Sequence, residues 1–231
     1  MEPQDFLALE ECLGVSFPDK AHITEAFTHR SFINEHPNHP TDHNERLEFL
    51  GDAVIELVVT EELFNKYKNA EGELTNWRAA LVNAVMLSEV CRGLNVEQFL
   101  LLSKGEAKET GKARSYILAN AFEAIVGAIY LDHGWDGAKE FLDRVLLPRL
   151  PYILEHKLYI DAKSKFQEIA QERVGVTPNY KVLEESGPDH AKVFVVGIYL
   201  NREQIATGDG TSKQEAQMSA AENALKAKGW E

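Results

Sequence analysis

Residues 44–58 carry two stripes of opposite character on what their spacing predicts to be a single helix. The apolar residues recur at helical spacing and form one stripe: Leu47, Leu50, Val54 and Val58. Glu45, Glu48 and Asp52 follow the same period, so their carboxylates line an adjacent stripe. Two carboxylates about 6 Å apart repel each other by roughly 2–3 kcal/mol at an effective dielectric constant near 20. Such a helix has to bury its apolar stripe and offset the repulsion on the other with solvent or a cation.

Gly51 lies inside this predicted helix, beside the acidic stripe. A glycine at an interior helix position costs about 1 kcal/mol relative to alanine. We interpret Gly51 as a point where another backbone approaches closely. This favours a partly enclosed carboxylate cluster over a solvated acidic face, which is the ordinary setting of acidic stripes.

The composition is that of a globular protein of one large or two small domains, with 231 residues, 44% hydrophobic and 26% charged. No apolar run approaches the roughly 18 residues of a membrane span. The first residues are acidic and lack the pattern of a signal peptide. Cys12 and Cys91 are too few for a disulfide framework, so we expect buried free thiols and a reducing, cytoplasmic location.

The formal net charge of −13 argues at first against a nucleic-acid partner. Most of the excess falls before residue 161, where 26 acids face 15 bases, against 11 acids and 9 bases afterwards. Acids gathered to hold divalent cations would count as negative in this balance although they are neutralised in use. The charge therefore does not exclude a nucleic-acid partner.

Helical spacing accounts for most of residues 1–156, where we expect no strand. The expected helices are residues 6–13, 20–27, 44–67, 74–94, 115–131 and 135–155, the last bent or ended near Pro148 and Pro151. Residues 29–43, 66–73 and 100–112 are predicted loops. The first of these loops contains His29, His36, His39 and His43. Their spacing matches no standard ligand pattern, which favours solvated histidines over a metal site.

Glu123 is the unusual residue of the predicted helix 115–131, because Phe122, Ala124 and Ile125 surround it. A carboxylate in such surroundings is costly unless it is paired or bound to a metal. Glu123 is therefore a second candidate for a carboxylate site.

The pattern changes after a short linker near residues 156–161. A helix is expected over residues 162–174, and strands over 180–185, 192–200 and 203–207, because β-branched and aromatic residues dominate there. Residues 208–210 are expected to break the sheet. Ser212 and Glu215 form a capping-box signature for a last helix. The predicted order is α-β-β-β-α over residues 161–231.

The run Glu45-Arg46-Leu47-Glu48-Phe49-Leu50-Gly51-Asp52-Ala53-Val54 resembles the signature of ribonuclease III endonucleases. Residues 28–31 (Thr-His-Arg-Ser), 104–106 (Lys-Gly-Glu) and 117–124 also resemble that family, and residues 161–231 are similar to a double-stranded RNA-binding domain. The resemblance covers nearly the whole chain. It implies a multidomain protein, with an all-α endonuclease domain over residues 1–156 followed by a small α+β (α-β-β-β-α) RNA-binding domain over residues 161–231.

The resemblance also implies roles for the acids. Glu48, Asp52 and Glu123, with position 120, would match the metal-binding set, and Glu45 and Glu71 would match two further acids near the scissile phosphate. Mg²⁺ prefers oxygen ligands, and two divalent ions about 4 Å apart can activate a water and stabilise a leaving oxygen. We expect Mg²⁺ as the cofactor, with Mn²⁺ able to substitute, and no organic cofactor.

Asn120 departs from the family pattern, which has Asp at this position. An asparagine keeps an oxygen that can act as a ligand but supplies no negative charge. Two interpretations compete: a variant ligand in an active enzyme, or a change that leaves a catalytically silent dimeric RNA-binding protein. A helical metal enzyme with an unrelated C-terminal module is a third, more distant alternative.

Phe49 reads as a core residue from its sequence alone. The resemblance implies instead that it packs into a hollow on a second subunit of a homodimer. Each subunit would then contribute one active centre and cut one RNA strand, leaving short 3′ overhangs. Processing of ribosomal and messenger RNA precursors is the family expectation.

The C-terminal domain would recognise the shape of double-stranded RNA through 2′-hydroxyl and phosphate contacts. By resemblance, three surfaces make these contacts: Gln167 and Glu168; Pro188, Asp189 and His190; and Lys213 with Gln214. Gln214 and Gln217 stand where family members often carry lysine. We expect modest RNA affinity from this domain alone.

Overall fold

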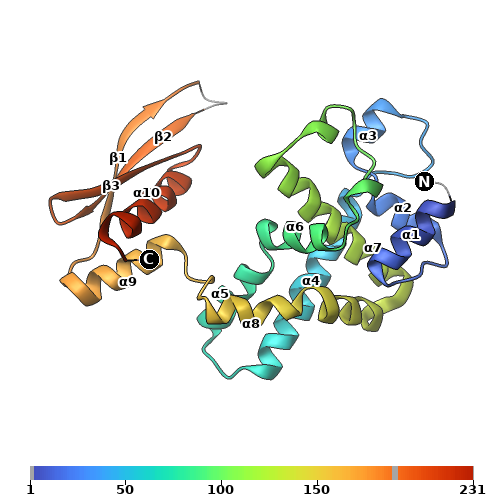
Figure 1. The fold of residues 1–231 in the computed structure, drawn as a ribbon, viewed down its shortest axis with the longest axis horizontal. Coiled ribbons are helices and arrows are strands. Elements are labelled where there is room, and N and C mark those ends of the chain that lie inside the picture. Colours follow the sequence, from blue (N-terminus) through green and yellow to red (C-terminus); the bar gives the residue numbers. More distant parts are fainter. Residues whose placement is uncertain (1–2, 189–191, 231) are drawn as a thin grey trace. The chain divides into compact units, whose positions relative to one another are not determined.

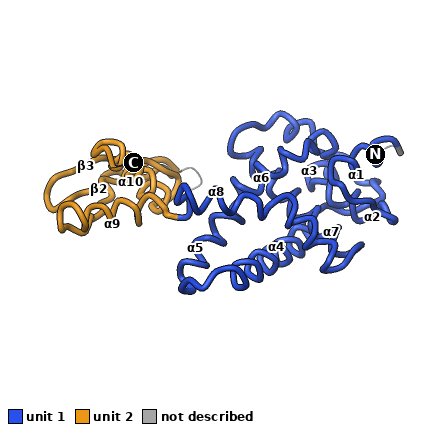
Figure 2. The backbone as a smooth tube through the Cα atoms, turned by 60° about the horizontal axis from the view of Figure 1, so that its bottom comes forward, with its two compact units in different colours: residues 1–159 blue, residues 160–231 orange. Residues whose placement is uncertain are grey.

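The computed structural model describes residues 3–188 and 192–230. Contacts within the chain divide it into two compact units, Met1–Tyr159 and Ile160–Glu231 (Figure 2). Each unit has a hydrophobic core of its own.

The first unit is built from helices (Figure 1). In chain order these are α1 (Pro3–Leu13), α2 (Lys20–Ala26), α3 (Arg30–Glu35), α4 (Glu45–Lys66), α5 (Glu71–Leu81), α6 (Ala84–Gly93), the 3₁₀ turns η1 (Glu97–Phe99) and η2 (Glu106–Lys108), α7 (Gly111–Val145), η3 (Leu147–Arg149) and α8 (Leu150–Glu155). Within its described residues, the β-type pairing outside helices is an isolated parallel bridge between Thr28 and Leu101. The expectation of a helical domain is confirmed.

The long helices α4 and α7 form the centre of this unit. The apolar stripe of α4 is buried, including Val54 and Val58, and it packs in one core with the buried face of α7 that carries Phe122 and Ile125. Helix α7 bends at Gly134, whose φ of 68° is left-handed. The bend falls between the two helices expected over residues 115–131 and 135–155.

Three local expectations for this unit were wrong. The single helix expected over residues 74–94 is divided, because Asn83 starts a new helix by accepting a hydrogen bond from the Met86 amide at 3.0 Å. The expected loop 29–43 contains α3, which begins after His29. Helix α7 begins at Gly111, inside the expected connector.

The second unit has the predicted α-β-β-β-α order, which is confirmed (Figure 1). Its elements are α9 (Ala162–Val174), β1 (Asn179–Ser186), β2 (Val193–Leu200), β3 (Glu203–Gly210) and α10 (Lys213–Lys228). The strands form an antiparallel sheet in the order β1-β2-β3. Phe166 of α9 and Ala220 of α10 pack with Ile198 of β2 in its core.

Gly208 and Gly210 do not break the sheet as expected, because β3 runs through to Gly210. A Cβ atom at Gly208 would lie 2.1 Å from the Ala220 amide nitrogen, and one at Gly210 would lie 2.6 Å from the Ala216 amide nitrogen. These glycines let the strand lie directly against α10. The expected cap is present, since Ser212 accepts a hydrogen bond from the Glu215 amide at 3.1 Å.

Cys12 and Cys91 are free thiols, as expected, although only Cys91 is fully buried. Burial raises the pKa of the Cys91 thiol to about 12. Across the described ranges, no helix is both long enough and apolar enough to cross a membrane.

Candidate carboxylate centre and nucleic-acid interface

Two glycines bring α4 and α7 into backbone contact. A Cβ atom at Gly51 would lie 1.7 Å from the Glu123 carbonyl oxygen, and a Cβ atom at Gly127 would lie 2.3 Å from the Leu47 carbonyl oxygen. Neither position has room for a side chain. The interpretation of Gly51 as a close-approach residue is therefore confirmed, and the partner backbone is that of α7.

This contact brings the acids of α4 beside Asn120 and Glu123 of α7. Burial raises the pKa of the Glu123 carboxyl to about 8, and the charges of Asp52 and Glu48 add to the rise. The pKa of Glu48 is also raised, first by burial and then by Glu45 and Asp52, while a hydrogen bond from Asn120 opposes the rise. The centre is thus a group of mutually repelling carboxylates in which Glu48 and Glu123 are partly buried and Asp52 is exposed.

The donor set suits a hard divalent cation, because every side chain in it offers oxygen. Asn120 uses its amide NH₂ to donate to Glu48, which leaves its oxygen available as a ligand. In their present positions, however, no three His, Cys, Asp or Glu side chains of the described ranges are close enough to hold an ion. Holding one would require the carboxylates to converge.

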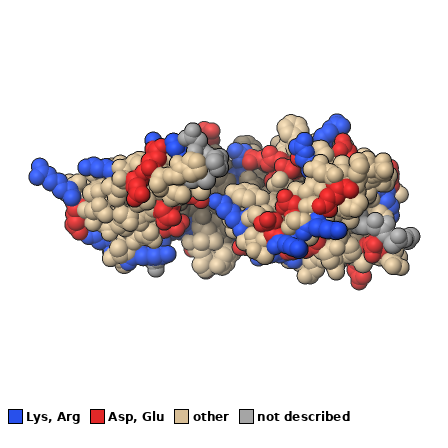
Figure 3. All heavy atoms as spheres, turned by 90° about the horizontal axis from the view of Figure 1, so that it is seen from above, with Lys and Arg blue, Asp and Glu red and all other residues tan. Residues whose placement is uncertain are grey.

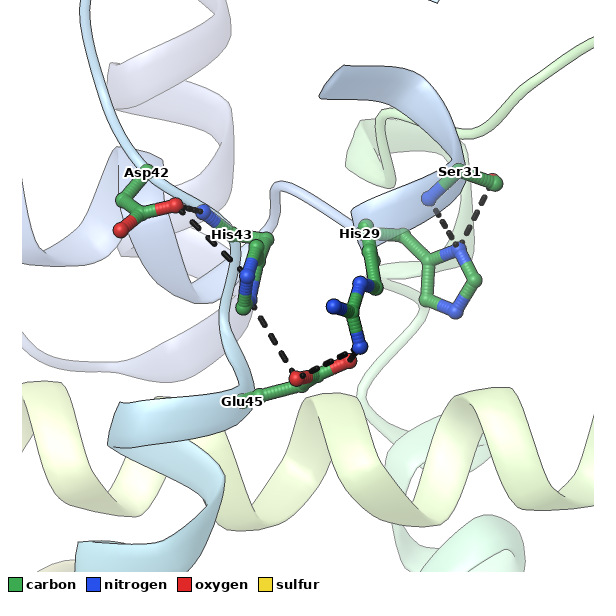
Figure 4. Close-up of polar contacts among 6 residues, drawn as sticks. His29, Ser31, Asp42, His43 and Glu45 are labelled. Carbon is green, nitrogen blue, oxygen red and sulfur yellow. Dashed lines mark hydrogen bonds and ion pairs between the residues drawn. The ribbon is translucent and has the colours of Figure 1, made fainter. Parts of the chain in front are cut away.

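Glu45 lies at the start of α4 and is held from two sides (Figure 4). Arg30 donates from Nη1 to both Glu45 carboxylate oxygens, at 3.1 and 3.3 Å. His43 approaches from the other side, with Nδ1 3.8 Å from Oε2, which is longer than a hydrogen bond. Asp42 accepts a hydrogen bond from the His43 backbone amide at 2.8 Å.

Glu71 lies apart from the other candidate site acids of this chain. It is the first residue of α5 and lines an open hollow of about 560 Å³ together with Phe64 and Leu63 of the last turns of α4. Glu48 lies in the first turn of that helix, roughly 25–30 Å away along its axis. The structure therefore brings together Glu48, Asp52, Asn120 and Glu123, places Glu45 beside them, and separates Glu71.

Phe49 is not a core residue of this chain, because 81% of it is exposed. It points out of the same helix as two further exposed apolar residues, Leu57 and Phe64. Together they give α4 an exposed apolar face that nothing in the described chain covers.

In the second unit, the expected RNA contacts lie at the surface. Gln167 and Glu168 are exposed on α9, and Pro188 is exposed after β1. Asp189 and His190 fall outside the described residues. Figure 3 shows Lys and Arg side chains interspersed with Asp and Glu over the face in view, without a continuous basic field.

Lys213 is the first residue of α10, and Gln214 beside it is exposed. The Lys213 ammonium lies 5.6 Å from the centre of the Phe194 ring, in a cation–π contact. Its positive charge also helps to lower the pKa of Glu185, after the larger effect of Lys192. Gln217 accepts a hydrogen bond from Lys163 at 2.8 Å and so links α10 to α9.

Arg30 and His43 are the residues of the centre to which sequence reasoning gave no role. His43 was grouped with solvated loop histidines, yet its side chain is only 22% exposed and faces Glu45. Arg30 was noted only as part of a resembling motif. Their positions in the sequence could have identified them: His43 lies two residues before α4, and Arg30 lies in the motif that precedes it.

Comparisons with known proteins agree with this architecture. The family described as "Ribonuclease-III-like" matches residues 19–150, and the family described as "Double-stranded RNA binding motif" matches residues 162–228. Ribonuclease 3 of Oceanobacillus iheyensis is 44% identical over 223 residues, which cover 96% of this chain and 97% of that protein. Ribonuclease 3 of Carboxydothermus hydrogenoformans is 42% identical over 227 residues, which cover 97% and 96%.

The first unit is also similar to solved structures of the nuclease domain of ribonuclease III from Campylobacter jejuni. One is 42% identical with a TM-score of 0.57, and it covers 65% of this chain and 98% of that domain. A second, which concerns structural flexibility in a region involved in dimer formation, is 44% identical with a TM-score of 0.56 and covers 62% and 96%.

Proposed function

This chain belongs to the ribonuclease III family, and from that premise we propose that it is a divalent-metal-dependent endoribonuclease that hydrolyses double-stranded RNA. The observation that carries the proposal is the partly buried carboxylate group at the contact between α4 and α7, in a chain that also has a double-stranded RNA-binding unit. Ionised carboxylates in such a group repel one another unless a bound cation offsets their charge.

In this proposal, Glu48, Asp52, Asn120 and Glu123 hold Mg²⁺, for which Mn²⁺ can substitute, and no organic cofactor takes part. Bound divalent ions would supply an activated water and stabilise the leaving oxygen. Glu123 holds a proton near neutral pH, since its pKa is raised to about 8, and it has to release that proton to become a ligand. Asn120 orients Glu48 through the hydrogen bond between their side chains.

Glu45 would act close to the scissile phosphate, because it lies one helical turn before Glu48. Its 3.1 Å contact with Arg30 would help to orient the carboxylate. Glu71 would be a further acid near the RNA backbone.

We also propose a homodimer in which Phe49 enters a hollow on the second subunit. The exposed apolar face of α4 supports this, and so does the dimer-forming region described for the C. jejuni nuclease domain. One centre per subunit would cut one strand each and leave short 3′ overhangs. Light scattering at micromolar concentration should give the mass of a dimer, and a monomer would contradict this part of the proposal.

The second unit would bind RNA by its shape, through Gln167 and Glu168, the segment of Pro188, Asp189 and His190, and Lys213 with Gln214. Its charges are mixed, which fits modest affinity. The expected substrates are precursors of ribosomal and messenger RNA in the cytoplasm.

The decisive experiment incubates the full chain with a long RNA duplex in Mg²⁺ or in EDTA. We expect cleavage with Mg²⁺ alone. Retention of the duplex without cleavage would support the second candidate, a catalytically silent RNA-binding dimer, which the neutral Asn120 favours. If the protein neither binds nor cleaves the duplex, that result would contradict both functions.

A further inference from the structure

Arg30 has donors that the protein itself does not use. Its side chain is 62% exposed, and one nitrogen, Nη1, makes both contacts with Glu45. Within residues 3–188 and 192–230, Nη2 and Nε have no hydrogen-bond partner. A guanidinium presents five donors in a rigid planar fork, so a second edge of Arg30 remains open to solvent.

The backbone that carries Arg30 is fixed. The neighbouring His29 accepts a hydrogen bond from the Ser31 amide at 3.2 Å, and the His29 amide donates to the Leu101 carbonyl at 3.0 Å. Ser31 in turn accepts from the Ser103 amide at 3.1 Å. In Figure 4, His29 and Ser31 lie at the start of α3, and His43 and Glu45 lie where the chain enters α4.

The start of α4 is tied to the same place. Asn44 is buried, its amide donates to the Thr28 carbonyl at 2.9 Å, and its side chain donates to the Ala26 carbonyl at 3.2 Å. Both ends of the Arg30–Glu45 pair therefore rest on rigid backbone. Ligand binding by Arg30 would therefore have to order its side chain but not its backbone.

The start of α4, which Arg30 contacts, carries three acids and one exposed base, Arg46. Glu45, Glu48 and Asp52 follow one another along α4, and an RNA phosphate that approaches them meets like charge. Arg30 lies at the edge of this group, where its charge would offset that repulsion. Planar arginine forks bind phosphate oxygens in pairs, and phosphate contacts fix the register of a nucleic acid on a protein.

We propose that Arg30 is an RNA-phosphate ligand, which contacts Glu45 through Nη1 and has its other edge free for the substrate. This inference rests on the proposed function, because it assumes that RNA passes the acids of α4. It adds a substrate contact in the nuclease unit to those expected in the RNA-binding unit.

The test measures the affinity of the full-length protein for a labelled RNA duplex in EDTA over a series of KCl concentrations. Each phosphate contact contributes about one unit to the slope of log affinity against log salt. Arg30→Met should lower the slope by about one unit for each Arg30 in contact and weaken binding several-fold at low salt. Arg30→Lys keeps the charge, so it should keep most of the slope.

Two further variants separate the explanations. Glu45→Gln should leave the slope unchanged or larger, since Arg30 keeps its charge; the same loss of slope in both variants would overturn the assignment. Lys139→Met is the matched control, because it removes one charge from an exposed ion pair with Asp143, which lies beside the last turn of α4. An unchanged slope in Arg30→Met, or an equal loss in Lys139→Met, would also overturn it. The measurement needs no cleavage, so failure of the wild type to cut RNA in Mg²⁺ would contradict the proposed function separately.

Discussion

Both units use glycine to bring two backbones into contact. Acidic side chains lie beside this contact in the first unit, and a lysine lies beside it in the second. In the first unit, Gly51 and Gly127 allow α4 to lie directly against α7, and this contact partly buries carboxylates that repel one another. In the second unit, Gly208 and Gly210 press β3 against α10, and Lys213 at the start of that helix stays at the surface over Phe194.

The difference lies in what each unit leaves unbalanced. The carboxylates of the first unit are held near one another, and burial adds to their repulsion. The cations near Lys213 already have partners, such as the 2.8 Å contact between Lys192 and Glu185. The first unit therefore leaves like charges unpaired at its helix contact, whereas the second unit pairs cations near the start of α10 with acids.

The largest effect should come from Gly51→Ala, which forces a Cβ atom against the Glu123 carbonyl. We expect a loss of roughly 3 kcal/mol or more in the free energy of unfolding. Cleavage should fall at least about 100-fold, because the carboxylates are displaced. Thermal unfolding and a cleavage assay measure both.

Gly208→Ala is the matched change in the second unit, since its Cβ would meet Ala220. It should weaken RNA binding, while hydrogen exchange in the α4 and α7 amides stays as in the wild type. Equal loss of exchange protection in both units from either variant would show that the two contacts are not independent.

Glu123→Gln should abolish cleavage yet make the metal-free protein less sensitive to pH. The folded protein holds a proton on Glu123, because its pKa is raised from 4.5 to about 8. The unfolded chain releases that proton, so stability of the wild type falls as pH rises between these values. Denaturant unfolding at about pH 5 and about pH 8 should show a smaller fall in the variant. Equal falls would show that Glu123 is not the buried proton carrier.

Asn120→Asp should change cleavage less, leaving it similar or raising it up to roughly tenfold. The added charge replaces a hydrogen bond to Glu48 by repulsion, so the metal-free protein should lose about 1–2 kcal/mol of stability. Cleavage kinetics and unfolding without metal measure the two effects. A silent wild type whose cleavage is restored by this substitution would show that Asn120 inactivates the protein.

Lys213→Ala should have the smallest effect. RNA binding should weaken modestly, and the salt slope should fall by about one unit, because one phosphate contact is lost. Lys228→Ala is a suitable control at the other end of α10, where Lys228 forms an exposed ion pair with Glu203 at 3.2 Å. No difference between the two slopes would remove Lys213 from the RNA interface.

The sequence predicted the features that local spacing determines. The stripes of α4, the order α-β-β-β-α and the role of Gly51 all follow from periodicity and from the steric cost of glycine. The same reasoning failed at Asn83, where the expected helix 74–94 is divided. The helical spacing of apolar residues continues past Asn83, so it did not reveal the cap. The reasoning also failed at Gly208 and Gly210, because composition alone cannot distinguish a glycine that ends a strand from one that admits a helix.

Contacts between distant segments were harder to predict. Arg30 and Glu45 lie 15 residues apart, at the starts of α3 and α4, and Thr28 close to Arg30 pairs with the distant Leu101. The separation of Glu71 from Glu48 depends on the full length of α4, which no local pattern specifies. The sequence indicated the chemistry of the side chains, whereas contacts between distant side chains could be identified only from the fold.

The position of Glu71 has a consequence for mixed dimers. Because Glu71 lies beyond the far end of α4, a role at a scissile phosphate would have to be exerted on the centre of the other subunit. A Glu48→Gln chain paired with a Glu71→Gln chain would then place both defects in one centre and leave the other intact. Such a heterodimer would nick one strand of a duplex, whereas two separately damaged centres would nick neither. Complementation between two inactive chains would thus show which subunit contributes Glu71 to each centre.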